Sequence, residues 1–221
     1  MKDNKALKVT CIVVIALLLV ATLALTMLKN YLMLPDGKVK DLIAAERLVC
    51  HPETFLDDAV ASPYQLDSAG QRQFLEQFGA ARDSVYSTRS QEYKTYTQIA
   101  NQLLVRPAAA VDTRDVAAGV LDVKIRSKWQ TRDGIKAQVE VVSYLNDVKL
   151  IDGRYHASFL VSENLYEYTF EKKDGQYYIL ECKNARGGLV STLDESLGRD
   201  FASYDEAVQY AKNNIPQNLY K

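Results

Sequence analysis

Hydrophobic and polar residues follow two different periods along this chain. Between residues 40 and 105, apolar side chains recur every three or four positions, which is the spacing of one helix face. The pattern predicts a short helix over 40–50, a second that begins near the N-cap candidates Asp67 and Ser68 and ends near residue 79, and a third over the later part of 83–105. A helical layer therefore precedes the rest of the domain.

From Leu121 onward the period changes to two, which is typical of strands with one buried face. The alternation runs from Leu121 to about Trp129, resumes over 135–141 after a Thr-Arg-Asp-Gly turn, and returns over 154–162. Residues 165–183 then read as a hairpin around Lys-Lys-Asp-Gly. This order of elements predicts an α+β fold in which helices pack on an antiparallel four-stranded sheet.

The C-terminal part of the chain predicts one more helix. Ser203 and Glu206 fit a capping box, and Pro216 ends the helix that follows them. Before it, the sequence Asn-Ala-Arg-Gly-Gly at 184–188 predicts a turn. This stretch lacks the spacing of a phosphate-binding loop, so it does not indicate a nucleotide site.

The stretch from Val9 to Leu28 contains no charge, proline or glycine. A helix of that length spans about 30 Å, the thickness of the hydrocarbon core of a bilayer. Lysines at positions 2, 5 and 8 favour a cytoplasmic amino terminus, with the domain on the outer side of the cell membrane. The alternative is a signal peptide that is cleaved after Ala24 and leaves a secreted protein.

These patterns divide the chain into five parts. They are a cytoplasmic tail over 1–8, a single-pass transmembrane anchor over 9–29, a linker over 30–40, an α+β domain over 41–185 and a C-terminal helical extension over 186–221. Lysine and arginine number 27 against 28 aspartate and glutamate. Because no basic run follows residue 8, we do not expect nucleic acid as a partner.

Side chains with reactive chemistry are few. Cys50 and Cys182 fall in the exported part, where oxidising conditions can join them as a disulfide; two reduced, buried thiols are the alternative. The chain has two histidines and no metal-binding spacing, so we expect neither a metal nor a cofactor. Cys50 and His51 are adjacent at a helix end, where their side chains diverge, so they do not predict a thiol nucleophile.

His156 lies on a strand, where it is either a partly exposed sheet residue or a group that binds an anion or moves a proton.

The hairpin is rich in tyrosine. Alternation places Tyr166, Tyr168 and Phe170 on one face of its first strand, and separates Tyr178, Leu180 and Cys182 from Tyr177 and Ile179 in its second. Tyrosine has a high strand preference and keeps its hydroxyl in water, so the rings are explained either as an ordinary sheet edge or as a wall that faces a ligand. The candidate binding residues are Tyr166, Tyr168, Tyr177, Tyr178, His156 and Trp129.

The closing strand, Asp-Gly-Gln-Tyr-Tyr-Ile-Leu-Glu, and the order of elements before it resemble the NTF2-like (cystatin-like) fold over roughly residues 40–185. Tyr178 stands where that family's pattern has tryptophan. The resemblance implies a curved sheet that wraps over the helices and often leaves a cone-shaped pocket. Two groups look similar: VirB8-like components of conjugation machines, with one membrane helix, and the domain that precedes amidase domains in secreted proteins of spore-forming bacteria. Both imply a domain without catalytic residues.

The leading functional hypothesis is a membrane-anchored binding or scaffolding module, without chemistry of its own, that recognises a protein or cell-envelope partner or copies of itself. One alternative is a pocket that binds or senses a small molecule or lipid, which requires an apolar cavity. The other is a pocket hydrolase or isomerase that uses His156, which requires a deep cavity around a group with a perturbed pKa.

Overall fold

The computed structural model describes residues 12–25, 33–58, 60, 65–105, 113–185 and 190–216. The chain forms two compact units, Met1–Pro35 and Asp36–Lys221. In the first unit, residues 12–25 form a helix with exposed side chains. No helix within the described ranges has both the length and the apolar character needed to span a membrane. The flanks of the predicted anchor, at 9–11 and 26–29, and the predicted tail at 1–8 lie outside the described residues.

The second unit begins with the helical layer that the sequence predicts. Its members are α2 (Asp36–Val49), the 3-10 helix η1 (Pro52–Phe55), α3 (Ser68–Val85) and α4 (Gln91–Val105). Of the two N-cap candidates, Asp67 caps α3, because its carboxylate accepts a hydrogen bond of 2.7 Å from the backbone N–H of Gly70. The helix continues past the expected end near residue 79, since Phe78 and Val85 extend its buried face.

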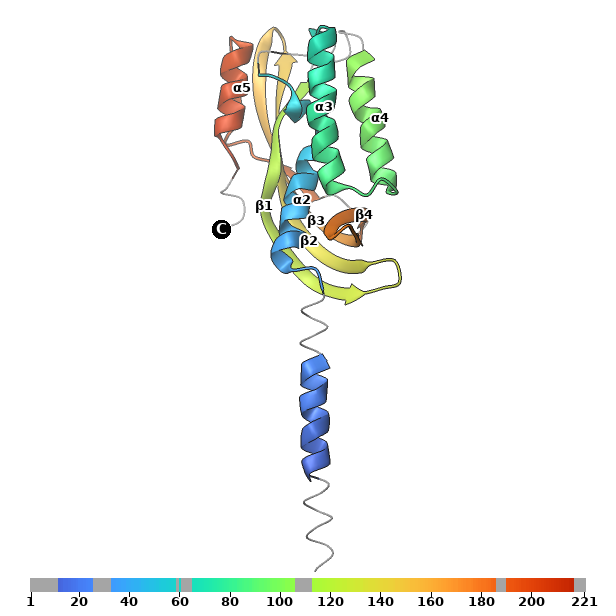
Figure 1. Cartoon of the computed structure of the whole chain (residues 1–221). Coiled ribbons are helices and arrows are strands. Elements are labelled where there is room, and N and C mark those ends of the chain that lie inside the picture. Colours follow the sequence, from blue (N-terminus) through green and yellow to red (C-terminus); the bar gives the residue numbers. More distant parts are fainter. Residues whose placement is uncertain are drawn as a thin grey trace, which may run out of the picture. The chain divides into compact units, whose positions relative to one another are not determined.

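The sheet is antiparallel and curved, and its first four strands lie in chain order (Figure 1). They are β1 (Thr113–Gln130), β2 (Ile135–Ile151), β3 (Arg154–Lys173) and β4 (Gln176–Asn184). The strands are longer than the alternating pattern predicts: β1 already starts at Thr113, and β2 continues through Asn146 and Asp147 to Ile151. Arg114 and Asn146 are buried polar residues with hydrogen-bond partners, so they interrupt the pattern without ending a strand.

Two short strands and the last helix complete the unit. The strands β5 (Val190–Leu193) and β6 (Arg199–Phe201) pair with the first half of β3, along the same edge that β4 pairs with further on. The final helix α5 (Tyr204–Asn213) has the predicted N-cap, because the Ser203 hydroxyl accepts from the Glu206 N–H.

The helices cover opposite faces of the sheet. The apolar core under α5 includes Val148 and Phe159, whereas Ala137 and Tyr168 point to the α2 side. Figure 1 shows α5 on one side of the long strands and α2, α3 and α4 on the other. The helix α5 covers only part of its face of the sheet. The rest of that face, toward the β1–β2 turn, is open and is called the open face below.

Candidate functional site

The tyrosine hairpin is formed by the end of β3 and by β4, and its inner side is the one that faces α2. On this side a tyrosine contacts a buried carboxylate. Glu46 on α2 is only 3% exposed and Tyr168 on β3 is fully buried. The Tyr168 hydroxyl donates to one Glu46 oxygen over 3.1 Å, and the Tyr86 hydroxyl donates to the other over 3.2 Å. Tyr168 on β3 and Tyr86, which follows α3, thus both donate to the same carboxylate of α2. These hydrogen bonds link α2 to the sheet.

Arg47 completes this network from the same helix. Its Nη2 donates to the Tyr168 hydroxyl over 3.2 Å, and its guanidinium carbon lies 4.6 Å from the centre of the Tyr166 ring. Its Nε lies 3.2 Å from Glu46, an ion-pair contact without hydrogen-bond alignment. Tyr166 therefore serves as a cation–π platform for Arg47, and Tyr168 as a bridge between two charges.

The two cysteines border the same network as free thiols. The Sγ atom of Cys50 lies 3.9 Å from the Tyr86 hydroxyl oxygen. Burial, reinforced by the Glu46 charge, raises the pKa of Cys50 to about 12 and raises the pKa of Cys182 as well. Both thiols stay protonated near neutral pH, which makes them poor nucleophiles.

A β-bulge decides which face Cys182 takes. Tyr168 pairs with Cys182 but Phe170 pairs with Ile179, so Leu180 is the extra residue. Cys182 and Ile179 consequently share the α2 side of the sheet. Simple alternation had placed them on opposite faces, and that expectation is wrong because the bulge inverts the order of faces once.

The outer side of the hairpin, which faces away from α2, borders an open cleft of about 400 Å³ that is called the hairpin cleft below. Tyr178 from β4 and Arg89 from the α3–α4 connection line it, together with the turn residues Lys172 to Asp174. Arg89 is 69% exposed and forms an ion pair with Glu171, which also accepts a hydrogen bond from Ser87. Tyr177 is half-buried beside Lys172, whose Nζ lies 5.3 Å from its ring centre.

Both histidines pair with aspartates on separate elements. The Nδ1 atom of His51 lies 2.9 Å from Asp115, and that of His156 lies 2.7 Å from Asp200. Because Cys50 points to Tyr86 instead, the structure does not bring Cys50 and His51 together as a reactive pair. Trp129 is half-buried at the end of β1, opposite Lys136, and lies in neither histidine cluster.

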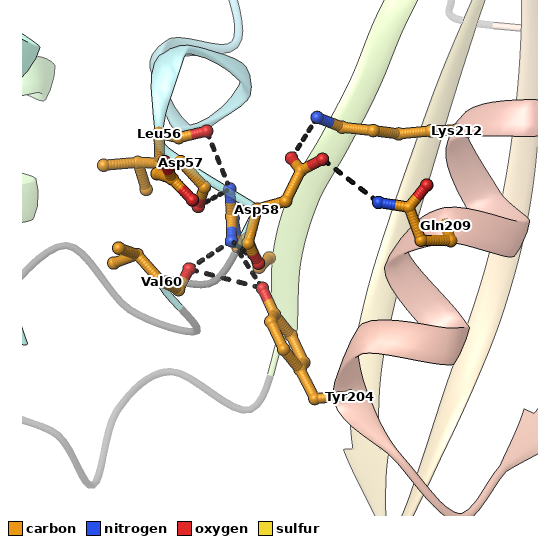
Figure 2. Close-up of polar contacts among 8 residues, drawn as sticks. Leu56, Asp57, Asp58, Val60, Tyr204, Gln209 and Lys212 are labelled. Atoms are coloured by element: carbon orange, nitrogen blue, oxygen red, sulfur yellow. Dashed lines mark hydrogen bonds and ion pairs between the residues drawn. The ribbon is translucent and has the colours of Figure 1, made fainter.

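A buried arginine organises the loop after η1. Arg114 on β1 is 2% exposed and makes no ion pair with the carboxylates of the described residues. Its guanidinium donates instead to oxygens of the chain: the backbone carbonyls of Leu56, Asp57, Asp58 and Val60 and, over 2.5 Å, the hydroxyl of Tyr204. Figure 2 shows these carbonyls converging on the guanidinium nitrogens.

The same loop also contacts α5. The Asp58 carboxylate accepts from the Lys212 ammonium and, over 3.4 Å, from Gln209 (Figure 2). Arg114 and Asp58 therefore connect β1, the loop and the C-terminal helix. Both Nη nitrogens of the guanidinium have protein partners and the unpaired Nε is buried, so this cluster holds structure.

Sequence reasoning missed Glu46, Arg47 and Arg114. A signal for Glu46 was present: Val39, Ile43, Glu46 and Val49 share one buried face of α2, so a carboxylate sits at an apolar position. Arg114 lies in a stretch that shows neither period, and its role depends on residues more than fifty positions away. No local pattern reveals such a contact.

No group of His, Cys, Asp and Glu side chains within the described ranges is arranged to hold a metal ion. No family model matches the chain, and no similar protein was found among curated proteins or solved structures.

Proposed function

We propose that the chain is a single-pass, membrane-anchored binding module with an NTF2-like fold, whose tyrosine hairpin recognises a protein or cell-envelope partner outside the cell. The uncharged stretch from Val9 to Leu28 supports the anchor. Over 12–25 it is helical and exposes large apolar side chains, for example Leu17 and Leu18. Such a surface is suited to lipid, because in water it would associate or aggregate.

The observation that carries the binding role is the division of the hairpin into two sides. Tyr166 and Tyr168 face inward to Arg47 and Glu46, and the fully buried Tyr168 has no surface to offer a partner. Tyr178 faces the open cleft beside Arg89. Tyrosine and arginine are among the residue types enriched at the energetic centres of interfaces. The proposed binding surface is therefore the outer side only.

The chemistry of the buried groups favours binding over catalysis. Both Glu46 oxygens are occupied by tyrosine hydroxyls, and each histidine is occupied by an aspartate. His156 does not line the hairpin cleft, which weakens the hydrolase or isomerase alternative. The cleft is polar and open, whereas a lipid-binding pocket needs an enclosed apolar cavity.

Site-specific photocrosslinking tests the binding surface in living cells. A photoreactive phenylalanine analogue replaces Tyr178 in the full chain, and a matched variant carries it at Glu206, which is exposed on α5. We expect a discrete adduct from position 178 that Arg89→Ala reduces, and none of the same size from position 206. Equal adducts from both positions, or no adduct from position 178, would contradict the proposed surface.

The anchor has its own test. After cell breakage and alkaline extraction the full chain should stay with the membrane pellet, and protease added outside intact spheroplasts should digest the second unit. Recovery of a trimmed, soluble chain, or protection of the unit from outside protease, would contradict the proposed topology.

A further inference from the structure

The open face of the sheet carries a second hollow, on the opposite side from Tyr168 and α2. This groove, of about 610 Å³, lies over β1, β2 and β3 and is bordered by Ile215 after α5. Its lining combines apolar residues with three carboxylates: Val120, Leu121, Val142, Tyr144 and Ile215 with Asp122, Glu140 and Glu163. None of these residues lines the hairpin cleft, so the two hollows are separate surfaces.

Strand register explains how the groove is built. Val142 pairs with Asp122 on one side and with Glu163 on the other, so these three residues form one row across the sheet. Strands lie about 4.8 Å apart, which puts the two acidic residues about 10 Å from one another across Val142. Glu140 and Tyr144 lie two positions away along β2 and point to the same face. The floor is therefore apolar and its rim is acidic.

The position of Tyr144 depends on a glycine. The ring lies over Gly119, where a Cβ atom would be 2.7 Å from Cε1 of Tyr144. Any larger residue at 119 would displace the ring. Gly119 thus lets the ring of Tyr144 approach the backbone of β1, and the tyrosine forms part of the lining of the groove.

The carboxylates differ in whether they are neutralised. Glu140 is held by Arg126, whose Nε donates over 3.0 Å. The carboxylates of Asp122 and Glu163 form no hydrogen bond or ion pair with any residue in the described ranges. Like charges that share a concave, partly apolar surface reinforce one another and attract cations. Lys124 lies on the same face, opposite Glu140, but makes no ion pair with Asp122 or Glu163. These two carboxylates can therefore each pair with a cationic group of a ligand.

We propose that this groove binds a cationic, apolar peptide segment of a partner protein. Lysine or arginine side chains pair with Asp122 and Glu163, and neighbouring apolar side chains cover Val142 and Tyr144. The apolar floor argues for a peptide over a bare cation, since a cation alone leaves that surface in water. The inference adds a second surface to the module proposed above and does not depend on the hairpin cleft.

Peptide binding to the full chain in nanodiscs of zwitterionic lipid tests this inference. The probe is a fluorescent peptide, acetyl-Gly-Leu-Lys-Val-Arg-Leu-Gly-amide, and its counterpart carries Glu in place of Lys and Arg. By fluorescence anisotropy we expect saturable binding of the cationic peptide that weakens with salt, and no binding of the anionic one. The double variant Asp122→Asn, Glu163→Gln should weaken binding by about tenfold.

Three further variants separate the explanations. Glu76→Lys, on the exposed side of α3, should bind like the unaltered chain, and so should Tyr178→Ser in the hairpin cleft. Gly119→Ala should weaken binding without any change of charge. Absence of binding, binding that the groove variants leave unchanged, or equal binding to empty nanodiscs would overturn the inference. Self-association that the groove variants abolish, without peptide binding, would overturn it in favour of a second copy.

Discussion

Glu46 and Glu163 lie against opposite faces of the same sheet, and the molecule uses them in opposite ways. Glu46 is buried and receives hydrogen bonds from Tyr86 and Tyr168. Glu163 borders an open groove, and its carboxylate has no partner among the described residues. The residue type is the same in both places. Whether the chain itself satisfies the carboxylate decides between a structural role and a binding role.

The largest expected difference is between the variants that remove Glu46 and Glu163 one at a time. Glu46→Ala removes the anion that balances the buried Arg47 charge and the acceptor of two tyrosine hydroxyls, so we expect the free energy of unfolding to fall by about 3 to 5 kcal/mol. Glu163→Ala should change it by no more than about 0.5 kcal/mol. Urea unfolding of the full chain in detergent, followed by fluorescence of the single tryptophan, Trp129, measures both. Similar losses in the two variants would remove the contrast.

Two arginines of β1 extend the comparison. Arg114→Met should cost about 3 kcal/mol, because four buried or partly buried carbonyls lose a charged donor. Arg126→Met removes only a partly exposed ion pair with Glu140 and should cost less than about 1 kcal/mol. The same unfolding assay applies. If only the Arg126 variant lost much of its free energy of unfolding, the stability of β1 would depend on contacts at the open face of the sheet, against this prediction.

Much of this fold is predictable from the sequence because it is encoded locally. The spacing of apolar residues and the capping residues predict where the helices lie. Asp67 caps α3 and Ser203 caps α5, as expected. The strand ends were not predictable, because Arg114 and Asn146 are polar residues that distant partners satisfy. The strands β5 and β6 are too short to show a period, and they exist because β3 offers them a free edge.

The sites were less predictable than the fold. The tyrosine hairpin was recognised, but a pattern of tyrosines does not show that Tyr168 meets a glutamate on a helix 122 residues earlier. The groove escaped detection because Asp122 and Glu163 become neighbours only through register with β2. Alternation identifies an outward face, and only pairing shows which outward residues share it.

Alkaline pH should destabilise the buried network around Glu46. An unfolded thiol ionises above roughly pH 8.5, whereas burial raises the pKa of Cys50 to about 12. Between these values the native state keeps a proton that the unfolded state has lost, so the free energy of unfolding falls by about 1.4 kcal/mol per pH unit. This contribution is fully present below the unfolded pKa and is lost as the pH rises through the folded one. Cys50→Ala should flatten the measured slope by that amount, and Asp122→Asn should leave it unchanged.

The smallest contrast concerns single hydroxyl groups on the two faces. Tyr168→Phe removes one donor from Glu46 and one acceptor from Arg47, while Arg47 and Tyr86 still contact the carboxylate, so we expect a loss of about 1 kcal/mol. The Tyr144 hydroxyl has no hydrogen-bond partner among the described residues, and Tyr144→Phe should alter stability by less than about 0.5 kcal/mol. Both variants keep the ring and hence the packing. If Tyr144→Phe cost as much as Tyr168→Phe, the open face would contain a structural contact, and its groove would be less available to a partner.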